Sequence, residues 1–202
     1  MGKLIVTEFM TLDGVAQSPG GREEDREEGF DHGGWQGPYM QEDDGDLLFQ
    51  QAAKMDALLL GRKTYDNFSG YWPTAPEMPW TELMNRVPKY VASSTLSEPL
   101  SWAGTTLLTG DLAAGVTALK EKHEQLHVIG SLDLLQSLLT HGLVDELNLW
   151  VYALVLGTGK RVFADGTVPA SLRLAESQTY EMGTVHLRYE LVGPPTYRDH
   201  EL

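Results

Sequence analysis

Three short groups of small, hydroxyl-bearing and basic residues follow runs of aliphatic residues in this sequence. They are Gly61-Arg62-Lys63-Thr64, Ser93-Ser94-Thr95 and Gly130-Ser131-Leu132. Backbone N–H groups at a helix start, hydroxyls and cationic side chains all bind phosphate. Each group alone also fits an ordinary strand end at the surface. If the preceding strands are parallel, their ends meet at one edge of a sheet, where ligands of open α/β sheets bind. The three groups together then predict one polyphosphate site.

Other common chemistries are not supported by the sequence. It contains neither a G-x-G-x-x-G motif nor a Walker A motif, which excludes an ordinary Rossmann domain and a P-loop enzyme. The cysteine count is zero, which excludes a cysteine nucleophile or a cysteine-based metal site. His123, His127 and His141 share no ligand spacing, and we therefore assign no metal.

The charge of the chain restricts its partners. The 202 residues carry a net charge of -14, which repels nucleic acid and anionic membranes. Ten acidic residues and two arginines between Arg22 and Asp46 account for -8 of this charge. No apolar stretch approaches the ~20 residues of a membrane-spanning helix. Together with the lack of cysteine, this predicts a cytoplasmic protein.

Alternating strand and helix patterns predict an α/β fold with a mostly parallel central sheet flanked by helices. Strands are expected at 3–10, 57–60, 89–93, 105–108, 126–129, 145–151, 172–180 and 185–192. Helices are expected at 42–54, 63–68, 80–86, 112–123 and 132–141. The last two strands read as an antiparallel hairpin. Residues 1–193 are expected to form a single domain, and 194–202 a polar tail.

A long segment, 15–41, lacks this periodicity and is rich in glycine, acids and aromatic residues. A structureless loop of this length inside a domain is usually functional or disordered. Phe30 and Trp35 favour partial order, because such rings normally pack on a surface.

Six sequence pieces in a fixed order resemble a known family. They are Met10-Thr11-Leu12-Asp13-Gly14, Leu59–Tyr65, Lys89–Thr95, Val128–Ser131, Gly142–Leu147 and Leu156–Phe163. The set resembles the dihydrofolate reductase fold. It is more similar to the C-terminal reductase domain of the bifunctional riboflavin-biosynthesis deaminase/reductase and to its small stand-alone relatives.

This resemblance implies an NADPH-dependent reductase. Gly61, Arg62 and Thr64, with Lys63 beside them, would then hold the cofactor phosphates. Ser93, Ser94 and Thr95 would hold the adenosine side and its 2′-phosphate, and Gly130, Ser131 and Leu132 would lie against the diphosphate and nicotinamide. Ser131 replaces the second glycine of the family's pair. Family members often have a cis peptide bond at that pair, so a cis bond at Gly130–Ser131 is expected.

The implied reaction is hydride transfer to a C=N or C=O carbon of a small heterocycle or carbonyl compound, which also requires a proton donor. Dihydrofolate reductases use a carboxylate in the first helix. Asp44 and Asp46 lie near that distance, eighteen and sixteen residues before Arg62, and Asp46 is slightly preferred. Asp13 is a second candidate. Acids that favour a helix dipole, and an Asp-Gly turn, explain the same residues without catalysis.

The substrate is not defined by the sequence. Trp35, Tyr39 and Trp72 could line a flat substrate by stacking, or could simply pack on the domain. The acidic 22–46 region is a poor place for a ribose phosphate. A homodimer is expected, with the strand face carrying Trp150 as one interface. Two alternatives to the enzyme remain: a catalytically silent nucleotide-binding module of the same fold, and an interaction protein whose acidic loop binds a basic partner.

Overall fold

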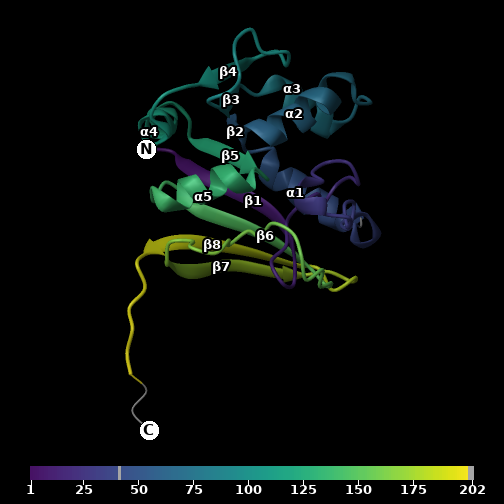
Figure 1. Cartoon of the computed structure of the whole chain (residues 1–202), viewed down its shortest axis with the longest axis vertical. Coiled ribbons are helices and arrows are strands. Elements are labelled where there is room, and N and C mark those ends of the chain that lie inside the picture. Colours follow the sequence, from purple (N-terminus) through teal and green to yellow (C-terminus); the bar gives the residue numbers. More distant parts are fainter. Residues whose placement is uncertain (41, 200–202) are drawn as a thin grey trace.

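The computed structural model describes residues 1–40 and 42–199, with the backbone alone for residues 42–46. In this part of the chain, eight strands form one sheet in the order β4-β3-β2-β5-β1-β6-β8-β7 (Figure 1). The strands are β1 (Lys3–Thr11), β2 (Ala57–Gly61), β3 (Lys89–Ala92), β4 (Thr105–Leu108), β5 (Gln125–Ile129), β6 (Glu146–Tyr152), β7 (Ser171–Thr179) and β8 (Val185–Gly193). The expected α/β fold is confirmed.

The direction of the strands changes twice, both times in the part of the sheet formed by β6, β8 and β7. Neighbouring strands from β4 to β6 are all parallel. β8 then pairs antiparallel with β6 and with β7, which gives the expected C-terminal hairpin. The carboxyl ends of the parallel strands therefore share one edge of the sheet, as the phosphate-site prediction requires.

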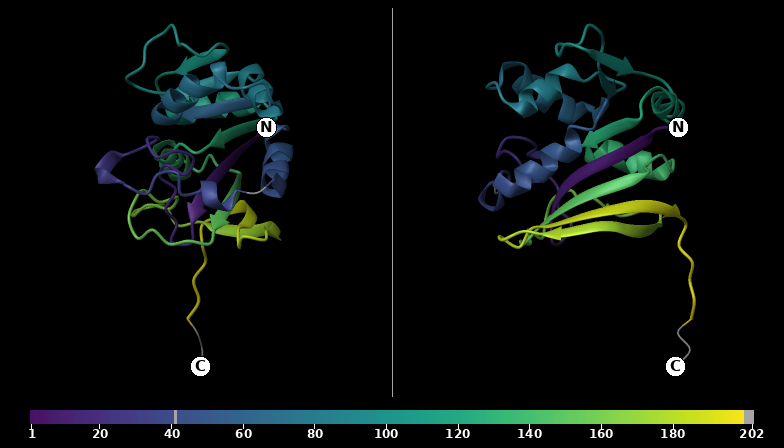
Figure 2. Two further views of the ribbon diagram at one scale, coloured as in Figure 1. Left: turned by 90° about the vertical axis from the view of Figure 1, so that its right-hand side faces the viewer. Right: turned by 180° about the vertical axis from the view of Figure 1, so that it is seen from behind.

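Helices cover both faces of the parallel part of the sheet (Figure 2). They are α1 (Glu42–Ala52), α2 (Arg62–Tyr71), α3 (Pro79–Arg86), α4 (Leu112–Lys122) and α5 (Leu132–Thr140), with 3₁₀ turns η1 (Glu27–Gly29), η2 (Gly37–Tyr39) and η3 (Trp72–Thr74). Strand β2 shows why two layers form. Leu59 packs in the cluster that α4 and α5 cover, whereas Leu58 and Leu60 pack in the cluster of α2 and α3. Alternate side chains of a strand point to opposite faces, so an all-apolar strand needs cover on both.

One helix boundary differs from the expectation by more than two residues. α2 starts at Arg62 and continues to Tyr71, three residues beyond the expected end at Phe68. Gly70 does not stop it, because a glycine within a helix lowers helix stability only modestly. The α-helix ends before Pro73, whose ring removes an N–H donor.

Residues 15–40, the described part of the 15–41 segment, are folded against the sheet. Phe30 and Trp35 are buried in a cluster with Tyr152 of β6. The backbone N–H of Ala16 donates to the carbonyl of Lys160 at 2.8 Å, which ties the start of the segment to the chain after β6. This packing places residues of the segment beside the carboxyl ends of the strands.

Candidate functional site

A cavity of about 790 Å³ lies along the carboxyl ends of the parallel strands. The residues that follow β2, β3, β4 and β5 line it, and the 15–41 segment lines its opposite side. Gly61, Arg62, Lys63 and Thr64 line this cavity, and so do Ser93, Ser94, Thr95, Gly130, Ser131 and Leu132. The structure thus brings together the residues for which the sequence predicted a phosphate site.

The junction of β2 and α2 is built by close contact with α5. A Cβ atom at Gly61 would lie 3.3 Å from Cβ of Leu134 and 3.4 Å from Cβ of Ser131, so a larger residue would push the helix away. The N–H of Gly61 donates to Oγ of Ser131 at 3.0 Å. Neither α2 nor α5 has a side-chain cap among the described residues. The N–H groups of their first turns therefore remain available to an anion.

Arg62 joins this junction to the end of β3. Its Nη1 donates to Oγ1 of Thr95 at 3.2 Å, and its Nε donates to Asp66 at 2.7 Å. Oγ of Ser93 accepts from the N–H groups of Thr95 and Leu96, both at 3.1 Å, which folds the 93–96 turn. A guanidinium beside hydroxyl groups is a suitable receptor for a phosphate ester.

The Gly130–Ser131 turn corrects one expectation. The cis peptide bond found in the described residues is Glu98–Pro99, and Gly130–Ser131 is trans, so the prediction of a cis bond there was wrong. Gly130 and Ser131 instead both have positive φ, 68° and 67°. Two left-handed residues reverse the chain between β5 and α5 without a cis bond. The N–H of Gly130 still bonds back to the carbonyl of Thr7 at 3.1 Å.

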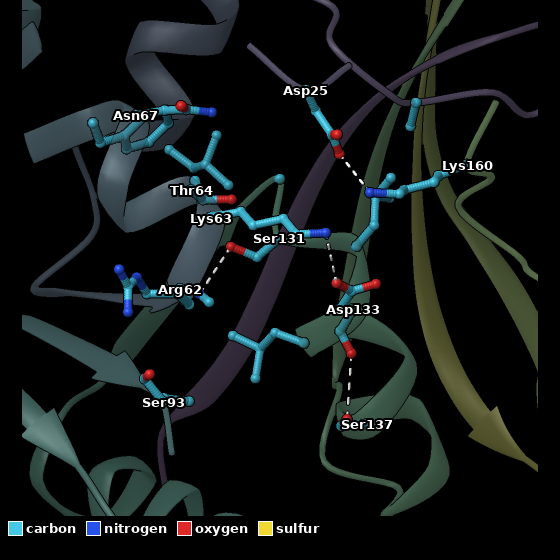
Figure 3. A pocket seen from close by; sticks show the side chains of 18 of the residues that line it. Asp25, Arg62, Lys63, Thr64, Asn67, Ser93, Ser131, Asp133, Ser137 and Lys160 are labelled. Carbon is cyan, nitrogen blue, oxygen red and sulfur yellow. Dashed lines mark hydrogen bonds and ion pairs between the residues drawn. The ribbon is translucent and has the colours of Figure 1, made fainter. Parts of the chain in front are cut away.

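Two lysines in the cavity are paired with acids (Figure 3). Lys160 donates to Asp25 at 2.6 Å and to Glu27 at 2.7 Å. Lys63 forms an ion pair with Glu27 and another, at 3.5 Å, with Asp133. Partial burial alone would lower the pKa of Lys160, but its hydrogen bonds to Asp25 and Glu27 raise that pKa above the ordinary value. An anion that binds the lysines must therefore compete with these carboxylates.

Glu8 of β1 also lines the cavity, and sequence analysis missed it. It is 2% exposed, and its Oε1 has no hydrogen-bond partner in the described structure. Burial raises its pKa from an ordinary value of 4.5 to about 8. A sequence signal existed: Glu8 interrupts the otherwise uncharged run from Leu4 to Met10 of a strand buried on both faces.

The structure describes the side chain of one of the three expected proton donors, Asp13. The side chains of Asp44 and Asp46 lie outside the described part of the structure. Asp13 does not line the cavity and instead accepts hydrogen bonds from Oγ1 of Thr11 and the N–H groups of Leu156 and Gly157. Burial pushes the pKa of Asp13 upward, but these bonds outweigh it and hold the pKa below its usual range. A carboxylate with a lowered pKa is a poor proton donor at neutral pH.

The aromatic residues expected to contact a substrate, Trp35, Tyr39 and Trp72, pack against other parts of the fold. Trp35 is 6% exposed, and its Nε1 donates to the carbonyl of Gln17 at 2.8 Å. Tyr39 packs edge-on against Tyr152, with ring centroids 6.2 Å apart. Trp72 packs against the α2 and α3 core cluster. None of the three lines the 790 Å³ cavity. Their contact with a substrate stays a prediction.

Backbone and polar side-chain groups of the 15–41 segment, and not its aromatic residues, line this part of the cavity wall. Gln17, Ser18 and Asp25 line it, together with Asn67 of α2, whose amide donates to the carbonyl of Glu24 at 3.1 Å. Sequence analysis did not single these residues out as site residues. Their position depends on contacts between distant segments, such as the bond from Gln36 to Tyr152 at 2.7 Å, which no local pattern reveals.

Two negative findings complete the description. No helix in the described residues is long and apolar enough to cross a membrane. Over the same part of the chain, no group of three or more His, Cys, Asp or Glu side chains is arranged to hold a metal ion.

Comparison with known proteins gives a consistent result. The model of the RibD C-terminal domain family matches residues 2–186. The chain is 30% identical over 146 residues to the uncharacterized protein YyaP of Bacillus subtilis, covering 69% of this chain and 76% of YyaP. A candidate riboflavin biosynthesis protein of Shewanella sp. PV-4 has a similar structure, with a TM-score of 0.72, 19% identity and coverage of 94% and 99%. For a pyrimidine reductase-like protein of Corynebacterium diphtheriae the TM-score is 0.67, with 15% identity and coverage of 95% and 92%.

Proposed function

This chain belongs to the RibD C-terminal domain family, and from that premise we propose that it is an NADPH-dependent reductase. Its substrate would be a small heterocyclic or carbonyl compound that accepts a hydride at a C=N or C=O carbon. Family membership supports the reductase role. The observation that carries the choice of cofactor is the order in which phosphate-binding and polar groups follow one another along the cavity.

That order matches the parts of a dinucleotide. Ser93–Thr95 lie at the end of β3, Gly61–Thr64 at the end of β2, and Gly130–Leu132 at the end of β5, whereas Glu8 lies on β1. Neighbouring strands are ~4.8 Å apart, so the path from β4 to β1 spans ~19 Å, comparable with an extended dinucleotide. Adenosine at β3 and β4, diphosphate at β2 and β5, and nicotinamide at β1 would then follow in sequence.

The residues present fit this cofactor. Arg62 and the 93–95 hydroxyls would hold a 2′-phosphate, as an arginine does in NADP-binding sites. Uncapped first-turn N–H groups of α2 and α5 would hold the diphosphate. When bound, the dihydronicotinamide supplies a hydride, and the protein contributes binding, orientation and the second proton.

A catalytically silent nucleotide-binding module is the alternative. Two observations favour it: Asp13 is engaged in structural hydrogen bonds away from the cavity, and Ser131 occupies the place of the family's second glycine. Substrate-dependent oxidation of NADPH, measured with a panel of cyclic imines, pyrimidinones and aldehydes, would exclude this alternative.

Replacing Arg62 with alanine is expected to weaken NADPH binding ~10- to 100-fold while changing NADH binding little. A charge-assisted hydrogen bond to a phosphate contributes ~1.5–3 kcal/mol, and 1.4 kcal/mol corresponds to tenfold in Kd. NADH lacks the 2′-phosphate that Arg62 is proposed to hold. Titration of tryptophan fluorescence and of melting temperature with each cofactor measures both affinities.

Arg173→Ala is the matched control, because Arg173 lies on β7 and pairs with Glu190 away from the cavity. It should leave both affinities unchanged. If the wild-type protein responds to neither NADPH nor NADH, the reductase proposal fails. Equal loss of NADPH and NADH binding in Arg62→Ala would instead indicate that Arg62 binds the diphosphate and not the 2′-phosphate.

A further inference from the structure

Glu8 sits where strand β5 ends and β1 continues into the cavity. The last pair between these strands joins Thr7 to Ile129, and Gly130 then turns away toward α5. Glu8 is opposite Leu149 of β6, which belongs to the core cluster that α5 covers. The carboxyl group therefore lies at the cavity wall under α5, at the β1 end of the proposed cofactor path.

The surroundings of Glu8 keep it uncharged. Its side chain forms no ion pair in the described residues, and its Oε1 accepts no hydrogen bond. The cations of the cavity are engaged elsewhere: Lys160 and Lys63 with Asp25, Glu27 and Asp133, and Arg62 with Asp66. The remaining titratable group of the wall, Glu24, accepts from the N–H groups of Gly20 and Gly21. With its pKa near 8, Glu8 holds a proton at neutral pH.

Among the described residues, Lys160, Asp25 and Asp13 are poorer donors than Glu8. Burial also raises the pKa of Glu24, but the hydrogen bonds that Glu24 accepts from Gly20 and Gly21 favour its ionised form. Lys160 holds its proton too tightly, because two carboxylates accept hydrogen bonds from it and raise its pKa. The hydrogen bonds to Asp25 and Asp13 lower the pKa of both carboxyls, so neither carries a proton at neutral pH. Glu8 combines burial, a free acceptor atom and a retained proton.

Resting on the proposed reductase function, we propose that Glu8 is the catalytic residue that donates the second proton of the reduction. The hydride adds to the carbon of the C=N or C=O bond, and the displaced electron pair of that bond takes the proton from Glu8 on the nitrogen or oxygen. The substrate gains two electrons and two protons in total, which is equivalent to two hydrogen atoms. The resulting Glu8 carboxylate regains its proton from water after the product leaves.

The charge of the cofactor would determine when Glu8 releases its proton. Beside a neutral dihydronicotinamide ring, Glu8 would be shielded from water and would keep its proton. Beside the positively charged ring of the oxidised cofactor, the ionised form of Glu8 would be favoured. Glu8 would thus become a stronger acid at the moment when the substrate needs a proton.

The test needs no substrate. Infrared difference spectra of wild type minus Glu8→Gln report the protonated carboxyl of Glu8, and this band is titrated from pH 5 to 10. The titration is repeated with NADPH, with NADP⁺, and with adenosine 2′,5′-bisphosphate, which lacks the nicotinamide end. We expect NADPH to raise the Glu8 pKa and NADP⁺ to lower it, with a difference of about one pH unit, and adenosine 2′,5′-bisphosphate to leave it unchanged.

A binding measurement checks the same coupling independently. A pKa difference of about one unit requires the NADP⁺/NADPH affinity ratio to rise about tenfold from pH 6 to pH 10 in the wild type. The ratio should stay flat in Glu8→Gln. Glu24→Gln is the matched control, because Glu24 lines the cavity from the 15–41 segment and should retain the wild-type rise.

The outcomes separate the two proposals. If neither cofactor nor adenosine 2′,5′-bisphosphate binds the wild type, the reductase proposal fails. If all three bind but leave the Glu8 titration identical, or if Glu8 is already ionised at pH 6, the proton-donor proposal fails alone. Should Glu8→Gln not fold, the wild-type carboxyl band, assigned by ¹³C-glutamate labelling, gives the same decision.

Discussion

Replacing Glu8 with glutamine is expected to raise the free energy of unfolding at pH 8 by ~3–5 kcal/mol and to leave it nearly unchanged at pH 4.5. The pKa of Glu8 is raised by burial to about 8 in the folded protein, against an ordinary 4.5 in an unfolded chain. Between these values the native state holds a proton that the unfolded state has released. Stability therefore falls as pH rises through this window, and a neutral glutamine avoids that loss.

Chemical denaturation of wild type and Glu8→Gln at several pH values between 4.5 and 9 measures this effect. The difference between the two proteins is the relevant quantity, because the paired carboxylates Asp25 and Glu27 add a pH dependence that both proteins share. Glu121→Gln, on the exposed side of α4, is the control and should follow the wild type. Parallel curves for wild type and Glu8→Gln would show that Glu8 ionises freely in the folded protein.

Glu8 lowers the stability of the fold at pH 8, and a role in catalysis would explain why such a residue is retained. An aliphatic residue at this position would satisfy a strand buried on both faces and would avoid an unpaired carboxyl group. Local choices that oppose stability are expected at functional sites, where they serve the chemistry instead. The burial of the Glu8 carboxyl group is therefore expected to account both for the stability gain of Glu8→Gln and for its loss of cofactor-linked titration.

Local patterns were sufficient to predict the frame of the site. Leu58, Leu59 and Leu60 indicated a buried strand, and Gly61 marked its end, where α5 approaches closely. Parallel pairing then forces the ends of β2, β3 and β5 to one edge. Residues 61–64, 93–95 and 130–132 were found together for this reason.

The remainder depends on contacts that the local sequence does not encode. Glycine followed by serine is compatible with a cis bond and with two left-handed residues, and the position of α5 decides between them. The sequence places Glu8 on a strand, but its burial at the cavity wall depends on the packing of the other elements against β1. The sequence alone makes Asp13 a candidate acid. Its carboxylate instead accepts hydrogen bonds from the N–H groups of residues 156 and 157, which lie more than 140 positions away in the sequence.

Replacing Trp35 with alanine is expected to lower the free energy of unfolding by ~3–5 kcal/mol, because it removes a large buried ring and leaves a cavity. The ring packs edge-on against Tyr152 at 5.6 Å and donates a hydrogen bond to the carbonyl of Gln17. Trp35→Phe keeps most of the ring but loses this bond, so a smaller loss of ~1–2 kcal/mol is expected. Denaturation curves of both variants measure these losses.

The same variants decide between packing and substrate contact for Trp35. Tyr197→Ala, which removes an 86% exposed ring from the C-terminal tail, is the control and should leave stability unchanged. If Trp35 were a wall of the substrate pocket, Trp35→Ala would retain wild-type stability and lose substrate binding. If it is a packing residue, Trp35→Phe should keep NADPH affinity, whereas Trp35→Ala should weaken it by releasing Gln17 and its neighbours from the cavity wall. Trp35 would then act on the site through the 15–41 segment that it anchors.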